Sequence, residues 1–382
     1  MALVIKCRVL FTIFKTIIHS INMRILHIAQ SLLGGGVQNL LLSLLPEQVK
    51  MGDEVGLIVI DRYSRDYCCV LERKLTKRGV QVFRLNKTVR SKLSLATTLV
   101  KCRNIVAKFN PDVLNSHTTL PNIYGAVSLM FSTVPQIITV HNGPEHWGML
   151  NKLLNNNAPL IFCSQSAYEL RLQKNKDIIA IDNGVSEYIV RSDMKVDLRK
   201  ELGLGEKAKI VVCVGSLRPQ KNYALLKSIV KEINCPDIHF CVCGGHYGEG
   251  YIDVNEFAEY KQSIHFIGLR ADISQIENGA DLFLSCAKFE GLPIAVLEAF
   301  FNGIPCVLSP IPQHKKIVEG VDAVYIPNSF NAKDFVKSIN EALDNRLSHD
   351  EIYENRKKAI NKFSISETAR RYRNFYIKHL KL

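Results

Sequence analysis

The sequence predicts an α/β protein of two domains with parallel sheets. The chain has 382 residues, which is long for one hydrophobic core and fits two domains of ordinary size. Short apolar segments typical of buried strands alternate with helical segments along the chain. A strand at 24–29 and another at 209–215 are each followed by a turn and a helix. We therefore expect two α/β halves that begin in the same way.

The composition narrows the class of protein. Apolar residues make up 47% of the chain and charged residues 22%, which fits a globular protein and excludes a disordered one. The net charge of +13 points to a polyanionic partner, which could be nucleic acid, anionic lipid or a phosphorylated substrate. The eleven cysteines form no C-x-x-C pair and no zinc-spaced cluster. Such a set is typical of reduced thiols, so we expect a cytoplasmic protein.

Residues 1–22 allow two interpretations. They are apolar but interrupted by Lys6, Arg8 and Lys15, which argues against a transmembrane helix and against a cleaved signal peptide. Read as a helix, they place most polar residues on one stripe, as in an amphipathic leader that lies on a membrane surface. Alternatively, translation starts at Met23, because the residues that follow have the pattern of a first strand.

A glycine turn, Gly34–Gly36, follows the first strand and precedes a helical segment. Such a turn exposes N–H groups to a phosphate, which makes Gly35 and Gly36 candidate ligands; a plain tight turn explains them equally well. The spacing does not fit G-x-G-x-x-G, which argues against a nicotinamide dehydrogenase. Pro46 should bend or end the helix.

The first half contains a long basic run. From Arg73 to Lys108 there are eleven Lys or Arg residues and no Asp or Glu. The run is either a solvated face or a surface for anionic lipid or phosphate, and we favour the second interpretation. Nucleic acid is disfavoured as a partner, because Phe83 is the only aromatic residue between the charges.

Polar residues follow several predicted strands, at the edge where open parallel sheets bind ligands. His117 and His141 each come directly after a strand. His141 is the better candidate, because asparagine and glycine follow it and keep the turn open, whereas a lone histidine is more often structural. Asn183–Val185 forms another turn after a strand.

The second half adds a pair of basic candidates. The polar segment 186–209 separates the two halves. After the strand 209–215, Arg218 and Lys221 lie three residues apart on a turn into a helix, a spacing that suits a grip on a diphosphate from one side. Solvated surface charge is the alternative for both.

The stretch Phe289–Ser309 combines a loop, a short apolar helix and a buried strand. Glu290 lies just ahead of the helix, where N–H groups and the helix dipole favour anions. Pro293 has the place of a first helical residue, and Gly303 offers a left-handed end. Glu298 is the only charge in the helix. Both glutamates are either ordinary surface carboxylates or residues of a site.

The second half resembles the retaining glycosyltransferases of family 4. Glu290 and Glu298 match the E-x7-E motif of this family in its EGLP variant, and Lys221 has the place of its diphosphate-binding lysine. The resemblance runs from about Met23 to the C-terminus and is weaker in the first half. The other matching segments are Gly34–Gly36, Thr139–His141, Asn183–Val185, Gly215–Asn222 and Ser309–Gly320.

Two positions depart from the family pattern. Many members carry arginine directly after the glycine of the diphosphate turn, where this chain has Ser216. Arg218 comes two residues later, and we expect it to take that role. Many members carry glutamate after the glycine pair, where this chain has Gln38.

The resemblance implies a GT-B fold, in which two facing Rossmann-like domains bind a nucleotide sugar between them. It implies an N-terminal acceptor-side domain over residues 23–190 and a C-terminal nucleotide-sugar donor domain over 191–365. It further implies that a last helix, 366–382, crosses back and packs on the first domain. Residues 1–22 form the leader or the mis-assigned start.

The resemblance also implies metal-independent transfer of a sugar, with retention, from a nucleotide-diphosphate sugar, and we expect a UDP-sugar. No cofactor is expected, and the sequence has no D-x-D pair for a metal ion. The implied site residues are Arg218, Lys221, Gly291 and Leu292 for the leaving diphosphate, Glu298 for the ribose, Glu290 and His141 for the sugar, and Gly35, Gly36 and Asn183 near the donor.

The basic first half and the possible leader suggest a lipid-linked acceptor. We expect a growing bacterial surface glycan, such as lipopolysaccharide, capsule or exopolysaccharide, and peripheral association with the cytoplasmic face of the inner membrane. Two alternatives stay open: a UDP-sugar 2-epimerase of the same fold, and a non-catalytic glycan- or membrane-binding protein. Intact Glu290, Glu298 and Lys221 argue against the second alternative.

Overall fold

The computed structural model describes residues 22–380 except for ten short stretches. These stretches are 34–35, 64–65, 89–91, 142–147, 170, 172–176, 187–194, 246–249, 291 and 346–347. The interpretations of residues 1–21, Gly35 and Gly291 therefore concern residues outside the described part of the chain.

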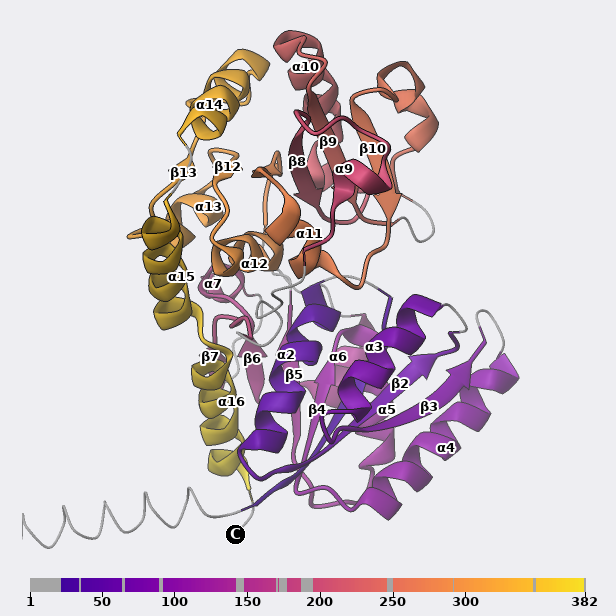
Figure 1. Cartoon of the computed structure of the whole chain (residues 1–382). Coiled ribbons are helices and arrows are strands. Elements are labelled where there is room, and N and C mark those ends of the chain that lie inside the picture. Colours follow the sequence, from indigo (N-terminus) through magenta and orange to yellow (C-terminus); the bar gives the residue numbers. More distant parts are fainter. Residues whose placement is uncertain are drawn as a thin grey trace, which may run out of the picture.

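The first domain is a seven-stranded parallel sheet with helices on its faces (Figure 1). The strand order is β3-β2-β1-β4-β5-β6-β7. The strands are β1 (Arg24–Ala29), β2 (Glu54–Asp61), β3 (Gln81–Lys87), β4 (Val113–His117), β5 (Gln136–Val140), β6 (Leu160–Phe162) and β7 (Ile178–Ala180). The helices are α2 (Gly36–Lys50), α3 (Asp66–Thr76), α4 (Lys92–Phe109), α5 (Thr119–Ser128), α6 (Met149–Asn155) and α7 (Gln165–Glu169).

The second domain repeats this plan with six parallel strands in the order β10-β9-β8-β11-β12-β13. The strands are β8 (Lys209–Val214), β9 (Ile238–Cys243), β10 (Ile264–Gly268), β11 (Leu282–Ser285), β12 (Cys306–Leu308) and β13 (Val324–Tyr325). The helices are α9 (Leu198–Glu201), η1 (Pro219–Lys221), α10 (Tyr223–Ile233), η2 (Val254–Tyr260), α11 (Ile273–Gly279), α12 (Ile294–Asn302), α13 (Pro312–Ile317) and α14 (Ala332–Asp344).

Both sheets reverse their strand order at the first strand of the domain. The reversal lies between β1 and β4 in the first sheet and between β8 and β11 in the second. Ligands of open parallel sheets bind at such points, outside the carboxyl ends of the strands. The prediction of two Rossmann-like, parallel-sheet domains is confirmed, and the two reversals locate the two halves of a site.

Two consecutive helices connect the domains along one side of the molecule (Figure 1). Helix α15 (His349–Phe363) packs on α12 of the second domain, and α16 (Ile365–His379) packs on α2 of the first. At their junction, Val185 N donates to Phe363 O at 2.9 Å and Ile365 N donates to Val185 O at 3.3 Å. A Cβ on Gly184 would lie 2.6 Å from Ile365 N, so only glycine permits this approach.

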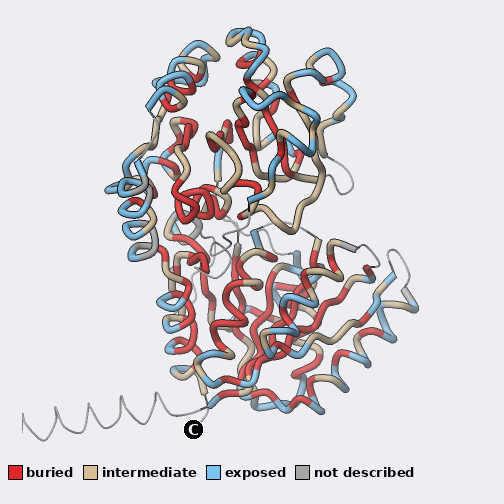
Figure 2. The backbone as a smooth tube through the Cα atoms, viewed as in Figure 1, coloured by how far each residue is buried: buried red, intermediate tan, exposed pale blue. Residues whose placement is uncertain are grey.

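The aromatic side of α16 completes the core of the first domain. Tyr372 and Tyr376 are fully buried and Phe375 is nearly so, in one cluster with residues of β1, β2 and α2. Figure 2 shows this inner side of the helix and the strands beside it as buried. The C-terminal helix of the chain therefore packs in the first domain, although it follows the second domain in the sequence.

Two helices differ from what their local sequence patterns favour. Pro46 was expected to bend or end its helix, and it does not end it, because α2 continues to Lys50. The buried leucines of α2 pack in the core of the first domain, and this packing outweighs one missing hydrogen bond. Ser364 caps α16 by accepting from Ser366 N, but Glu367 makes no capping box, because both its oxygens bind Arg370 at 2.7 Å.

Two ion pairs join α16 to the first domain, one buried and one exposed. Their loss can therefore be compared as a matched test of what burial contributes to stability. Arg373 pairs with the fully buried Asp53 at 3.2 Å, whereas Lys378 pairs with the exposed Asp177 at 2.7 Å. Asp53→Ala should lower the free energy of unfolding by about 3–5 kcal/mol, because it removes the buried partner of a charge. Asp177→Ala should change it by about 1 kcal/mol or less. Urea titration followed by circular dichroism measures both, and equal losses would contradict this account.

Candidate active site

The centre of the candidate site is the loop between β11 and α12. Helix α12 begins at Ile294, and Pro293, which was expected in the place of a first helical residue, is its N-cap with φ −78° and ψ 82°. Gly303 ends the helix with φ 73°, as predicted. Glu290 therefore lies just before the N-terminus of a buried helix, where N–H groups face outward.

An ion pair joins this loop to the turn after β8. Lys221 Nζ lies 2.6 Å from Glu290 Oε1, and the two side chains are 21% and 8% exposed. Gln220 Nε2 donates to Phe289 O at 2.8 Å, which fastens the turn η1 to the same loop. The structure thus brings together two of the predicted site residues, at the carboxyl ends of the adjacent strands β8 and β11.

Two glycines and an asparagine make this approach possible. A Cβ on Gly215 would lie 2.7 Å from Lys221 Cε, and a Cβ on Gly244 would lie 1.9 Å from Gly215 O. Asn222 has φ 58° and lies in the left-handed region between η1 and α10. Asparagine tolerates this conformation better than most residues. The glycine after β8 therefore leaves room for the lysine, and the glycine after β9 leaves room for the backbone of Gly215.

Arg218 does not join this pair. Its Nη2 donates to Tyr251 Oη at 2.9 Å, and its guanidinium lies 5.0 Å from the centre of the Tyr251 ring. The side chain is exposed. The sequence places Arg218 and Lys221 on one turn, but in the structure they point to different partners.

Glu298 is a buried carboxylate of α12 with another carboxylate beside it. Glu298 is 6% exposed. Glu277 of α11 is fully buried; its Oε2 accepts from Asn302 Nδ2 at 2.6 Å, and its Oε1 has no partner in the described part of the chain. Burial raises the pKa of both carboxyls, and the charge of Glu298 raises that of Glu277 further.

A lysine of the first domain faces these carboxylates. Lys74 Nζ, on α3, donates to Ala271 O of the second domain at 2.5 Å. Its positive charge lowers the pKa of Glu298, while burial lowers the pKa of Lys74 itself. The basic run from Arg73 was predicted to be a surface for anions. Lys74 belongs to this run but lies against the other domain, and the anion-binding surface stays a prediction for the rest of the run.

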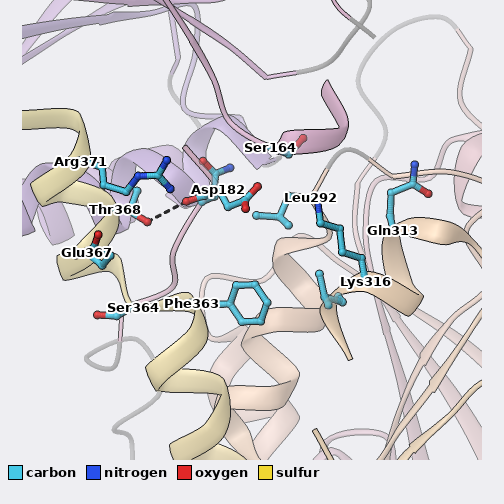
Figure 3. A pocket seen from close by; sticks show the side chains of 12 residues that line it. Ser164, Asp182, Leu292, Gln313, Lys316, Phe363, Ser364, Glu367, Thr368 and Arg371 are labelled. Atoms are coloured by element: carbon cyan, nitrogen blue, oxygen red, sulfur yellow. Dashed lines mark hydrogen bonds between the residues drawn. The ribbon is translucent and has the colours of Figure 1, made fainter. Parts of the chain in front are cut away.

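Of the remaining predicted residues, Gly36, Asn183 and His141 lie on the first domain, and Leu292 lies on the second. Gly36 begins α2 and is exposed. Asn183 is buried, and its Oδ1 has no partner among the described side chains and backbone. Asn183 and Leu292 line one cavity of about 170 Å³ between the domains, shown in Figure 3. Lys316 and Arg371 line it as well, together with two acids, Asp182 and Glu367.

His141 is the end of a chain of three histidines. His117 Nδ1 lies 3.0 Å from His141 Nε2, and His27 Nδ1 lies 3.0 Å from His117 Nε2. Sequence reasoning missed His27 and ranked His117 below His141 as a site candidate. The available signal was topological, because the three residues lie on or directly after β1, β4 and β5, which are neighbours in the sheet.

Metal-binding clusters and membrane-spanning helices are both absent from the described residues. These residues contain no group of three or more His, Cys, Asp or Glu side chains that could hold a metal ion. None of their helices is long and apolar enough to span a bilayer.

The raised pKa of Glu298 predicts a pH-dependent stability. A carboxyl whose pKa is higher in the folded state than its usual value of about 4.5 destabilises the fold when ionised, and this effect disappears as the pH falls towards 4.5. Glu298→Gln should therefore raise the melting temperature more at pH 8 than at pH 5. Glu259→Gln, at an exposed position, is the control and should change it at neither pH. A pH-independent effect of Glu298→Gln would contradict the assignment.

Comparisons with known proteins fit this geometry. The model of "Glycosyltransferase Family 4" matches residues 34–191, and that of "Glycosyl transferases group 1" matches 194–359. The Escherichia coli UDP-Gal:alpha-D-GlcNAc-diphosphoundecaprenol alpha-1,3-galactosyltransferase is 24% identical over 73% of this chain and 79% of its own length. The Bacillus subtilis putative glycosyltransferase EpsF is 22% identical over 80% and 82%.

The fold comparison agrees. The structure of Anabaena Alr3699/HepE in complex with UDP-glucose has a TM-score of 0.72 and 20% identity, and the match covers 94% of this chain and all of that one. The GT-B fold predicted from the sequence is thereby confirmed. The two family models, one on each domain, support the identification of this chain as a GT-B glycosyltransferase similar to family 4.

Proposed function

We propose that this protein transfers a sugar, with retention at the anomeric carbon, from a UDP-sugar to a growing, lipid-linked bacterial surface glycan. The names of two similar proteins support the substrate classes: one uses UDP-Gal and a diphosphoundecaprenol-linked acceptor, and the other was crystallised with UDP-glucose. The observation that carries the proposal is the Lys221–Glu290 pair just before α12, together with the buried carboxylate of Glu298, which lies eight residues after Glu290.

The chemistry requires stabilisation of the negative charge on the leaving diphosphate. In the proposal, Lys221 and the N–H groups at Gly291 and Leu292 supply it, since a helix N-terminus and an ammonium group both favour anions. Arg218 would turn from Tyr251 to the diphosphate. No metal ion or cofactor is part of the proposal.

In the proposal, the two carboxylates and residues of the first domain bind the ribose and the sugar of the donor. Glu298 would accept hydrogen bonds from the ribose hydroxyls, and these bonds would satisfy a carboxylate that is otherwise buried at a cost. Glu290 would orient the sugar through its hydroxyls, with His141 opposite. Gly35, Gly36 and Asn183 would line the donor side of the cleft.

A face of the first domain supports the membrane part of the proposal. Leu93 and Val100 lie two turns apart on α4 and are 76% and 62% exposed. Further exposed apolar side chains follow α5 and lie on α6, which pack in sequence beside α4: Met130, Phe131, Met149, Leu150 and Leu153. From Arg73 to Tyr168 the sequence has only two acids, Asp112 and Glu145. We call these apolar residues and the basic side chains beside them the α4–α6 face.

A donor screen tests the proposal. Purified protein is incubated with a panel of nucleotide sugars, with and without bacterial membrane extract, and UDP release is measured. The proposal expects UDP release from one UDP-sugar that depends on the extract, and a product of retained configuration. Epimerised UDP-N-acetylglucosamine without transfer would favour the epimerase, and binding of a sugar without turnover of any donor would favour a non-catalytic protein.

Removal of the lysine tests the diphosphate role. Lys221→Ala should lower kcat by about 100-fold or more, because the charge is needed when the glycosidic bond breaks. Lys231→Ala removes an exposed lysine from the helix after the same turn and should leave kcat unchanged. A Lys221→Ala enzyme with the wild-type rate would remove this assignment.

Charge reversal tests the α4–α6 face. Arg103 and Lys108 are exposed on α4, to either side of the stripe that contains Leu93 and Val100. The double variant Arg103→Glu, Lys108→Glu should weaken sedimentation with anionic vesicles at low salt by about tenfold or more. The same change at Lys333 and Lys337, exposed on α14, is the control and should have little effect. Wild-type protein that does not sediment would refute the membrane part.

A further inference from the structure

Four side chains of the first domain form one continuous chain of hydrogen bonds. Gln48 Oε1 lies 2.9 Å from His27 Nε2, His27 Nδ1 lies 3.0 Å from His117 Nε2, and His117 Nδ1 lies 3.0 Å from His141 Nε2. The ring centres of neighbouring histidines are 5.3 Å apart. Gln48, His27 and His117 are fully buried, and only His141 has partial exposure.

Burial keeps the three imidazoles neutral. It lowers the pKa of His27 and of His141 to about 4 and that of His117 well below its usual range. A neutral imidazole has one N–H donor and one lone-pair acceptor. Every bond between rings joins an Nδ1 to an Nε2, so the position of one proton determines the positions of the others.

The amide of Gln48 sets the direction of the chain. Its oxygen can only accept, so His27 must donate from Nε2 and accept at Nδ1. His117 then donates from Nε2 to His27, and His141 donates from Nε2 to His117. The lone pair of His141 Nδ1 is left over, and the described residues contain no hydrogen-bond partner for it. A buried glutamine far from the loop after β5 thus determines what that loop offers to a ligand.

We propose that Gln48, His27 and His117 are positioning residues that hold His141 in its neutral Nε2–H tautomer, so that Nδ1 accepts a hydrogen bond from a hydroxyl group of a carbohydrate substrate. The role of the hydroxyl rests on the proposed function, whereas the tautomer does not. The site then selects a hydroxyl group as a donor at this point, and a substrate that offers only an acceptor there leaves both lone pairs unmatched.

Nitrogen NMR of the full-length protein labelled with ¹⁵N-histidine tests the tautomer directly. Variants of each histidine assign the signals. Long-range ¹H–¹⁵N correlation should show His27, His117 and His141 as neutral Nε2–H tautomers that do not titrate between pH 6 and pH 8. A His141 that carries its proton on Nδ1, that exchanges between both tautomers, or that titrates in this range would overturn the proposal.

A change at Gln48 tests the positioning role. Gln48→Met removes the accepting oxygen at similar volume, so His141 should show both tautomers. The value of kcat should fall about fivefold, which is the loss expected for one neutral hydrogen bond, and the donor KM should stay within twofold of wild type. Gln136→Met is the matched control: it removes an amide that binds Ser116 and Asn122, outside the chain, and should alter neither the tautomer nor kcat. An unchanged His141 tautomer and kcat in Gln48→Met would overturn the proposal.

The two readouts separate this inference from the proposed function. The predicted tautomer in a protein that turns over no nucleotide sugar would leave the histidine chain standing and defeat the function. Turnover of a nucleotide sugar by a protein with mixed His141 tautomers would support the proposed function and overturn the role of the histidine chain.

Discussion

The contact between Lys221 and Glu290 is the interaction on which the rest of the candidate site depends. It joins the turns after two adjacent strands, β8 and β11, at the reversal of the strand order in the second sheet. The lysine can reach the carboxylate because glycines, Gly215 and Gly244, follow β8 and β9 and because Asn222 adopts a left-handed conformation. The pair in turn places a positive charge beside the N-terminus of α12, where a diphosphate is most strongly favoured.

The site is also constrained by two acids that are buried in the second domain. Glu298 and Glu277 lie on packed helices, and Lys74 of the other domain is the cation that acts on Glu298. Such a cluster destabilises the protein when ionised and unpaired, and functional sites are where this arrangement is commonly found. Because Lys74 also binds the backbone at Ala271, the same side chain connects the two domains across the cleft. The helices α15 and α16 connect them on the outside (Figure 1).

The features that the sequence predicted are those encoded by neighbouring residues. The strand–turn–helix openings of both halves, the short apolar helix after Glu290 and its end at Gly303 follow from local patterns, and the structure has all of them. Features that depend on distant segments were not predictable in this way. The partner of Arg218 is Tyr251 on a separate loop, and the partner of Glu298 comes from the first domain.

The histidine chain shows the same limit within one domain. His27, His117 and His141 look unrelated in the sequence, and only the strand order β1-β4-β5 brings them into contact. Pro46 was expected to bend or end its helix, and the helix does not end there, because the tertiary packing of α2 outweighs the local preference. The roles given to the site residues follow from the resemblance and the geometry together, and they stay predictions until binding is measured.

Calorimetric binding of UDP and of 2′,3′-dideoxy-UDP to wild-type protein and to Glu298→Gln tests the central claim most directly. If Glu298 binds the ribose hydroxyls, wild-type protein should bind UDP about tenfold or more tightly than the dideoxy analogue, and the variant should reduce this difference to about threefold or less. Equal affinities of the wild-type protein for both nucleotides, or a difference that the variant preserves, would contradict the account.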